Sequence, residues 1–285
     1  MFTLFAIPKA FRDHAGLIQR NALRSWTLLE PRPEILLFGD DEGTAEIAAE
    51  LAVQHVPEVK RNRFGTPNLG DCFTLARKIA ANPILCYVNA DIILMNDLVD
   101  AVHKIAAWSS QFLIVGRRWD LDIRSELDFS SQWAETLREQ ARIQGRLGEA
   151  TFMDYFVFTA ETATGFPAFA VGRPFWDNWF IYHARSQKVR VVDVTDQVLV
   201  VHQNHSYAHV PAREGERWQG PEGNQNLMLA GGWLHVFTLD DCTHRLTDRG
   251  VRPAFSWRRL SRFLLRFRAF HPQFNSFVRS LKRSG

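Results

Sequence analysis

The sequence has few cysteines and no long apolar segment. Its 285 residues include three cysteines, none close to another, which argues against a disulfide framework and a cysteine zinc site. The longest apolar runs, such as residues 2–7, are far shorter than the roughly 18 to 20 residues of a membrane-spanning helix. The N-terminus also lacks the basic, apolar and small-residue regions of a secretory signal. We therefore expect a cytoplasmic protein.

Excess positive charge is confined to the C-terminal segment. The chain carries a net charge of +3, and residues 252–285 hold nine Arg and Lys with no Asp or Glu. Subtracting these nine cations from +3 leaves −6 for residues 1–251. An acidic body with a separate basic segment does not fit a nucleic-acid-binding groove, so no nucleic-acid partner is expected.

Glycine-rich phosphate loops are also missing. The sequence contains neither G-x-G-x-x-G nor G-x-x-x-x-G-K-[ST], which disfavours dinucleotide-dependent dehydrogenases and P-loop enzymes. An early glycine-rich loop bearing Arg and Lys is absent too, which disfavours a nucleotidyltransferase that makes sugar nucleotides.

Strand and helix patterns alternate over the first 116 residues. Strands are predicted at 2–7, 34–38, 56–59, 84–88 and 112–115, and helices at 15–29, 44–53, 71–81 and 96–108. This alternation predicts an α/β fold with a mainly parallel sheet and helices on both faces. With hydrophobic residues at 46%, the chain can bury a core of this size.

The second half follows a looser pattern. Residues 117–150 predict a helical insertion with turns, 152–158, 189–194 and 198–201 predict strands, and 175–186 predicts a helix. Residues 220–232 are interpreted as a loop over the site or an ordinary connection. We expect one domain over 1–251, divided into halves at 1–116 and 117–251, followed by a tail at 252–285.

Acidic residues follow two of the predicted strands. Asp40 and Asp41 follow strand 34–38, and Asp91 lies in an apolar run after strand 84–88. These residues are either turn and helix-capping residues or ligands at the carboxyl edge of the sheet, where open α/β sheets bind substrates. Asp91 favours the ligand interpretation, because an ionised carboxylate among apolar neighbours is costly without a cation or several donors.

A cluster of histidines near residue 202 is the second candidate feature. His202 and His205 can supply imidazoles to a metal held by a carboxylate, although a polar loop with surface histidines would give the same pattern. Carboxylate oxygens suit Mg²⁺ or Mn²⁺, and such ions neutralise a diphosphate.

The sequence resembles the GT-A-type, family-two-like glycosyltransferases of the nucleotide-diphospho-sugar transferase superfamily. The resemblance rests on the N-terminal strand, on Phe38-Gly39-Asp40-Asp41 and on Tyr87-Val88-Asn89-Ala90-Asp91, which corresponds to the D-x-D signature. It implies that Asp40 or Asp41 contacts the nucleobase or ribose and that Asp91 holds the metal. The first acid of D-x-D is Asn89 here, so one negative charge is missing.

The resemblance extends to about residue 210. Gly172-Arg173-Pro174-Phe175-Trp176-Asp177 resembles the acceptor-side acidic motif of inverting members, although the usual Glu-Asp pair is Trp-Asp here. It implies that Asp177 is the general base, with Asp154 as the second candidate for base or acceptor binding. His202 matches a late metal-ligating histidine, and His205 is the competing choice.

The implied function is transfer of a sugar from a nucleotide-diphosphate sugar to an acceptor hydroxyl, with Mn²⁺ or Mg²⁺ and inversion of configuration. The acceptor would be a glycan, a lipid-linked compound or a protein, in polysaccharide or glycoconjugate biosynthesis. The alternative is a non-catalytic protein that binds nucleotide sugars on the same scaffold. This alternative is based on Asn89 and Trp176, which stand at positions where the family has acidic residues.

The tail predicts a basic amphipathic helix. Apolar residues fall on one arc and arginines on the other, as Trp257, Leu260, Phe263, Leu264, Phe267 and Phe270 against Arg258, Arg259, Arg262 and Arg266. Such a helix either packs on the protein's own core or lies at an anionic membrane surface, which would place the protein peripherally at the inner face of a membrane.

Overall fold

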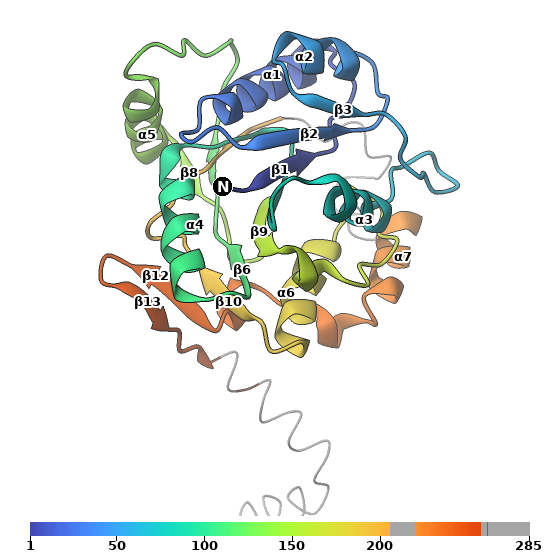
Figure 1. Ribbon diagram of the computed structural model, residues 1–285, viewed down its shortest axis with the longest axis vertical. Helices are drawn as coiled ribbons and strands as arrows, with labels where there is room; N and C mark the ends of the chain where they lie inside the picture. The colour runs from blue at the N-terminus through green and yellow to red at the C-terminus, as the bar shows by residue number, and fades with distance from the viewer. Residues whose placement is uncertain (206–219, 258–260, 262–285) are drawn as a thin grey trace, which may run out of the picture.

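The computed structural model describes residues 1–205, 220–257 and 261, and its centre is a nine-stranded sheet (Figure 1). In spatial order the strands are β13 (Gly250–Pro253), β12 (His244–Thr247), β10 (Arg190–Asp193), β6 (Phe112–Val115), β9 (Tyr155–Thr159), β4 (Ile84–Val88), β1 (Thr3–Ala6), β2 (Glu34–Phe38) and β3 (Gln54–Val56). The pairs made by β9 and the β12–β13 pair are antiparallel, and the remaining pairs are parallel. The predicted α/β class and the mainly parallel sheet are confirmed.

Helices cover both faces of this sheet. Helices α1 (Asp13–Thr27), α2 (Thr44–Glu50) and α4 (Asn96–Trp108) contribute to one hydrophobic cluster, and α3 (Leu69–Ile79) and α6 (Trp176–Ser186) to the other. In β1, Leu4 and Ala6 belong to the first cluster, while Phe5, and Ile7 directly after the strand, belong to the second. Successive side chains of a strand point to opposite faces, so a strand covered on both sides reads as an unbroken apolar run.

A smaller sheet lies beside the first. Its order is β5 (Ile92–Ile93), β11 (Val201–Gln203), β7 (Trp119–Leu121) and β8 (Arg146–Leu147). Helix α5 (Trp133–Gln144) packs on it through a third cluster that includes Leu137 and Ala141. Since β5 follows β4 after a turn that contains Asp91, this sheet meets the central sheet at the carboxyl end of β4.

The structure corrects three sequence predictions. Residues 117–150 hold only one helix, α5, and also strands β7 and β8, so the insertion is not purely helical. The second correction concerns the positions of two strands. The strand expected at 56–59 is β3 at Gln54–Val56, and the strand expected at 198–201 is β11, which includes His202. Short strands that pair with only a few partner residues carry too little apolar periodicity to locate from sequence.

The third correction concerns residues 220–232, which are not a loop. They contain helix α7 (Pro221–Leu229), with proline at its first position, and the short 3₁₀ helix η2 (Trp233–His235) begins next. Proline is well suited to that first helical position. The buried residues of α7 include Glu222 and Asn226, so its inner side is polar and gives no apolar stripe in the sequence.

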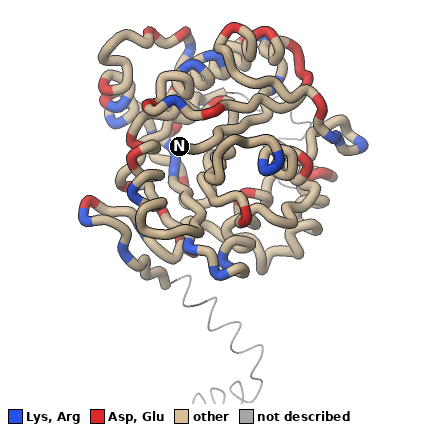
Figure 2. The backbone as a smooth tube through the Cα atoms, in the orientation of Figure 1, with Lys and Arg blue, Asp and Glu red and all other residues tan. Residues whose placement is uncertain are grey.

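Charges of both signs are interspersed over the described backbone (Figure 2). Arg252 and Pro253, the first residues of the predicted tail, belong to β13, and Trp257 is exposed. Trp257 and Ser261 are helical, and the rest of the predicted tail helix lies outside the described residues. Among the described residues, no helix is both long enough and apolar enough to cross a membrane.

Candidate active site

Asp91 lies in the turn between β4 and β5, at the carboxyl end of a central strand. Its side chain is 17% exposed, and its Oδ1 is buried with no hydrogen-bond partner among the described residues. Burial opposes ionisation of this carboxyl, but the hydrogen bond from His205 and the charges of His202, His205 and Lys9 outweigh it and hold the pKa of Asp91 below its usual value. The site therefore favours an ionised carboxylate that still has one unsatisfied oxygen.

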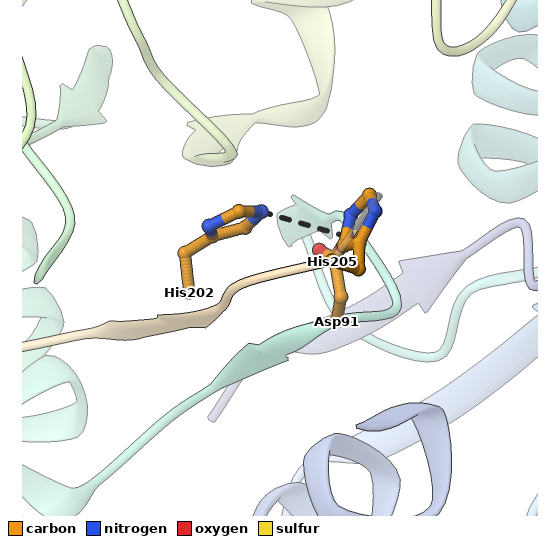
Figure 3. A group of neighbouring side chains, drawn as sticks. All are labelled: Asp91, His202 and His205. Carbon is orange, nitrogen blue, oxygen red and sulfur yellow. Dashed lines mark hydrogen bonds and ion pairs between the residues drawn. The ribbon is translucent and has the colours of Figure 1, made fainter. Parts of the chain in front are cut away.

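The structure brings both predicted histidines to this carboxylate (Figure 3). The Nε2 of His205 is 3.0 Å from Oδ2 of Asp91, and the Nε2 of His202 is 3.9 Å from the same oxygen. One ligand atom from each of the three residues can be chosen so that all lie within 4.8 Å of one another. Two imidazoles and one carboxylate at this spacing form a candidate site for a divalent metal ion.

Strand pairing explains why these residues meet. In β11, His202 is aligned with Ile92 of β5 on one side and with Asp120 of β7 on the other. The next residue, Gln203, is fully buried, and its side-chain amide donates to the backbone carbonyls of Ile18 and Asp91. These bonds fix β11 against the turn that carries Asp91.

The partly exposed Asn89 and the buried Asp154 form a polar pair close to Asp91 in the chain and in the fold. The side-chain amide of Asn89 donates to Oδ1 of Asp154 at 2.6 Å, and the Tyr87 hydroxyl donates to Oδ1 of Asn89 at 3.1 Å. Arg118 donates to the other oxygen of Asp154. Both oxygens of Asp154 are therefore engaged, and Asn89 is oriented toward Asp154.

Asp177 lies in the first turn of α6. Its Oδ1 is buried and has no hydrogen-bond partner in the part of the chain that the structure describes, although the residue as a whole keeps some exposed surface. Burial, with the charge of Asp154 adding to it, raises the pKa of Asp177 to about 7 against the opposing effect of backbone amides at the helix start. A carboxyl with a pKa near neutrality can accept a proton and release it again at physiological pH.

The segment that leads into Asp177 is held by α7. Arg173 donates through Nε to Glu222 at 2.8 Å, and Glu222 also accepts from Asn62. Asn226 bonds to the backbone of Ala170 through both its oxygen and its amide, and to the carbonyl of Pro174. Helix α7 thus positions the start of α6.

Tyr87 shows that the acidic residues share one neighbourhood. Burial is the largest cause that raises the pKa of its hydroxyl well above the usual value, and the negative charges of Asp91, Asp154 and Asp177 add to it. The ring of Tyr87 also packs edge-on against Trp176, the residue before Asp177. Asp91, Asp154 and Asp177 therefore all lie near enough to the Tyr87 hydroxyl for their charges to affect its pKa.

Asp40 and Asp41 form a separate group after β2. Both carboxylates pair with Arg61, at 2.6 Å and 2.9 Å respectively. The hydrogen bond from Arg61 lowers the pKa of Asp40. Gly39 precedes them with a φ of +98°, a conformation that favours glycine, and it turns the chain out of the strand.

Sequence reasoning did not find Arg118 and Asp120. The Nδ1 of His202 is 2.9 Å from Oδ1 of Asp120, and Arg118 donates to that same oxygen through Nε at 2.9 Å. The available signal was a carboxylate between Trp119 and Leu121, and β7 is too short for that pattern to identify a strand. Only the pairing of β7 with β11 assigns these residues to the site.

Comparison with known proteins identifies the fold. The sequence matches no protein-family model and no curated protein. Glucosyl-3-phosphoglycerate synthase from Mycobacterium tuberculosis, solved with phosphoglyceric acid, is similar over 82% of this chain and 81% of that chain, with 11% identity and a TM-score of 0.50. A mycobacterial protein is similar over 82% of this chain and 76% of that chain, with 13% identity and a TM-score of 0.50.

The arrangement is therefore the GT-A fold of the nucleotide-diphospho-sugar transferases, as the sequence resemblance predicted. Open α/β sheets bind their ligands at the carboxyl edge of the central strands. This edge carries Asp91 at the end of β4 in the present chain.

Proposed function

We propose that this protein is a glycosyltransferase that uses a nucleotide-diphosphate sugar and a divalent metal ion. One observation carries the proposal: a group of two histidines and one carboxylate lies at the carboxyl edge of the GT-A sheet, beside a separate buried carboxyl whose pKa is about 7. The first group suits a metal–diphosphate complex, and the second suits proton transfer.

The residues at the edge fit a metal ion. Asp91 offers a buried oxygen to which no described residue hydrogen-bonds, and the imidazoles of His202 and His205 face the same carboxylate. A bound Mn²⁺ or Mg²⁺ would stabilise the negative charge that develops on the departing nucleoside diphosphate. Asp91, His202 and His205 are the residues proposed to hold it.

Asp177 is proposed as the general base. It would accept the proton of the acceptor hydroxyl as that oxygen attacks the sugar, which gives inversion in a single displacement. Asp154, the other candidate, is held on both oxygens by Asn89 and Arg118, so its contacts favour a structural contribution. A buried carboxyl with a pKa near 7 suits proton transfer, and this supports catalysis over the alternative.

Asp40 and Asp41 are proposed to meet the nucleoside half of the donor. They follow β2, two strands from β4 in the sheet, and Arg61 holds both carboxylates in place. Hydroxyl groups of a ribose are suitable donors to such carboxylates.

The test is a thermal-shift and calorimetric panel of uridine, guanosine and other nucleoside diphosphates with and without Mn²⁺. A ligand present at 100 times its Kd should stabilise the fold by about 2.7 kcal/mol. Asp91→Asn should remove the metal-dependent part of this stabilisation, while Asp100→Asn, an exposed change on α4, should leave it intact. Unchanged affinity and metal dependence in Asp91→Asn would exclude Asp91 from the site.

A further inference from the structure

Asp120 does not face the proposed metal directly but contacts one of its candidate ligands. Its carboxylate can only accept hydrogen bonds, so the Nδ1 of His202, 2.9 Å from Oδ1, must carry the hydrogen. The other nitrogen of that ring, Nε2, is the one that lies 3.9 Å from Oδ2 of Asp91. The Asp120 bond therefore directs the opposite nitrogen of His202 toward the metal site.

Asp120 is itself fixed by a buried arginine. Arg118 has a side chain only 10% exposed, and it joins Asp120 to Asp154. The ring of Phe152 lies against its guanidinium, with the Cζ of Arg118 5.5 Å from the ring centre. Gly148 packs closely on the same residue, since a Cβ added there would come within 3.2 Å of the Arg118 carbonyl oxygen.

These contacts run in one line from β4 to β11. Asn89 binds Asp154, Asp154 binds Arg118, Arg118 binds Asp120, and Asp120 binds His202. The line begins two residues before Asp91 and ends on a histidine that faces Asp91. An aspartate at position 89 would place a second carboxylate against Asp154. The asparagine found there instead donates a hydrogen bond to Asp154, which accounts for the departure from the D-x-D signature.

We propose that Asp120, held in place by Arg118, is a positioning residue that orients His202 for metal binding. This inference rests on the proposed metal site and adds the residue that prepares it. A carboxylate behind a ligating histidine fixes its tautomer and ring orientation, and loss of such a partner commonly weakens metal binding by about 10-fold to 100-fold. Any direct contact of Asp120 with the metal is unnecessary for this effect.

The experiment is a double-mutant cycle on Mn²⁺ affinity, measured by titration calorimetry on the full-length chain without nucleotide. Asp120→Ala should raise the Kd for Mn²⁺ by about tenfold or more, and Asp120→Asn, which keeps an acceptor oxygen, should raise it less. In a His202→Ala background, Asp120→Ala should cause no further change, because the ring on which Asp120 acts is gone. A residue that only supports the fold would change the Kd by the same factor in both backgrounds.

Two controls make the result interpretable. Asp122→Ala removes a nearby carboxylate that accepts a hydrogen bond from Asn204 at 2.7 Å, and it should leave the Kd unchanged. Arg118 keeps Asp154 as a partner in Asp120→Ala, so the variant should fold, which circular dichroism and the melting temperature can confirm.

The failures of the two proposals are distinct. If the parent chain does not bind Mn²⁺, the metal site itself is wrong. If the parent chain binds Mn²⁺ and Asp91→Asn does not, the metal site stands. If Asp120→Ala then keeps the Kd for Mn²⁺ within twofold of the parent value, the positioning role of Asp120 is overturned. Equal effects of Asp120→Ala with and without His202 would also overturn it.

Discussion

At the residue scale, the carboxyl of Asp177, proposed above as the general base, also affects the stability of the fold. Its neutral form is favoured in the folded chain, because burial raises its pKa from the ordinary 3.8 to about 7. Stability linked to this group is therefore present at low pH and is lost as the pH rises through about 7. The difference between the two pKa values corresponds to at most about 4 kcal/mol.

Asp177→Asn is expected to stabilise the fold at pH 8, because it removes a poorly solvated charge. This gain in stability should shrink as the pH falls toward 4. Chemical denaturation at both pH values measures this, with the exposed Asp100→Asn as the control. The same variant should abolish sugar transfer with donor binding intact. A stability gain that is independent of pH would show that the pKa of Asp177 is the same in the folded and the unfolded chain, and would contradict the raised pKa.

The residues proposed to hold the metal predict a preference among ions. Imidazole nitrogens suit transition-metal ions better than Mg²⁺, and affinities rise from Mn²⁺ to Co²⁺. We expect the parent chain to bind Co²⁺ more tightly than Mn²⁺ and Mn²⁺ more tightly than Mg²⁺, as measured by titration calorimetry. His205→Ala should reduce the difference between Mn²⁺ and Mg²⁺. Equal affinity for Mg²⁺ and Mn²⁺ would contradict binding through two histidines.

Sequence reasoning identified the residues of this site unevenly, for a physical reason. Asp91 was visible because a carboxylate in an apolar run is costly, and His202 and His205 were visible as a local cluster. Asp120 and Arg118 act through pairing between strands more than 80 residues apart, as His202 and Asp120 show. No local pattern records that kind of contact.

At the element scale, burial on two faces determined what could be predicted. Strands β2, β4 and β6 were located to the residue, because each is an apolar run enclosed by both hydrophobic clusters. Helix α7 was predicted as a loop, since it is held by the polar side chains of Glu222 and Asn226. Polar anchoring leaves no periodic apolar signal.

The role of α7 can be tested through Asn226. This fully buried side chain satisfies the backbone of Ala170 and the carbonyl of Pro174, so Asn226→Ala should leave buried groups unpaired at a cost of about 1 to 3 kcal/mol each. Denaturant unfolding measures the loss, and faster hydrogen exchange at residues 170–174 should accompany it. Gln225→Ala, an exposed change on the same helix, is the control. If Asn226→Ala and Gln225→Ala were equally stable, Asn226 would not be what holds α7 to the segment before α6.

At the scale of the whole molecule, the charge of the chain is divided between its parts. Residues 1–251 carry the acidic excess. Of the nine cations of residues 252–285, Arg252 lies in β13 and the other eight follow that strand. Phe255 and Trp257 lie just after that strand and are 69% and 75% exposed. Exposed aromatic residues next to a basic segment are typical of contact with an anionic membrane surface.

Removal of residues 258–285 separates the two interpretations of the tail. If the tail contacts membranes, the truncated chain should keep its melting temperature but no longer co-sediment with anionic vesicles at low salt, since each cation near such a surface contributes about 1 kcal/mol. If the tail packs on the core, truncation should cause aggregation or a large loss of melting temperature. Replacing Arg258, Arg259, Arg262 and Arg266 by Gln in the full chain provides the matched control, because it keeps the apolar arc and removes only charge. Vesicle binding that survives both changes would show that the tail is not the membrane contact.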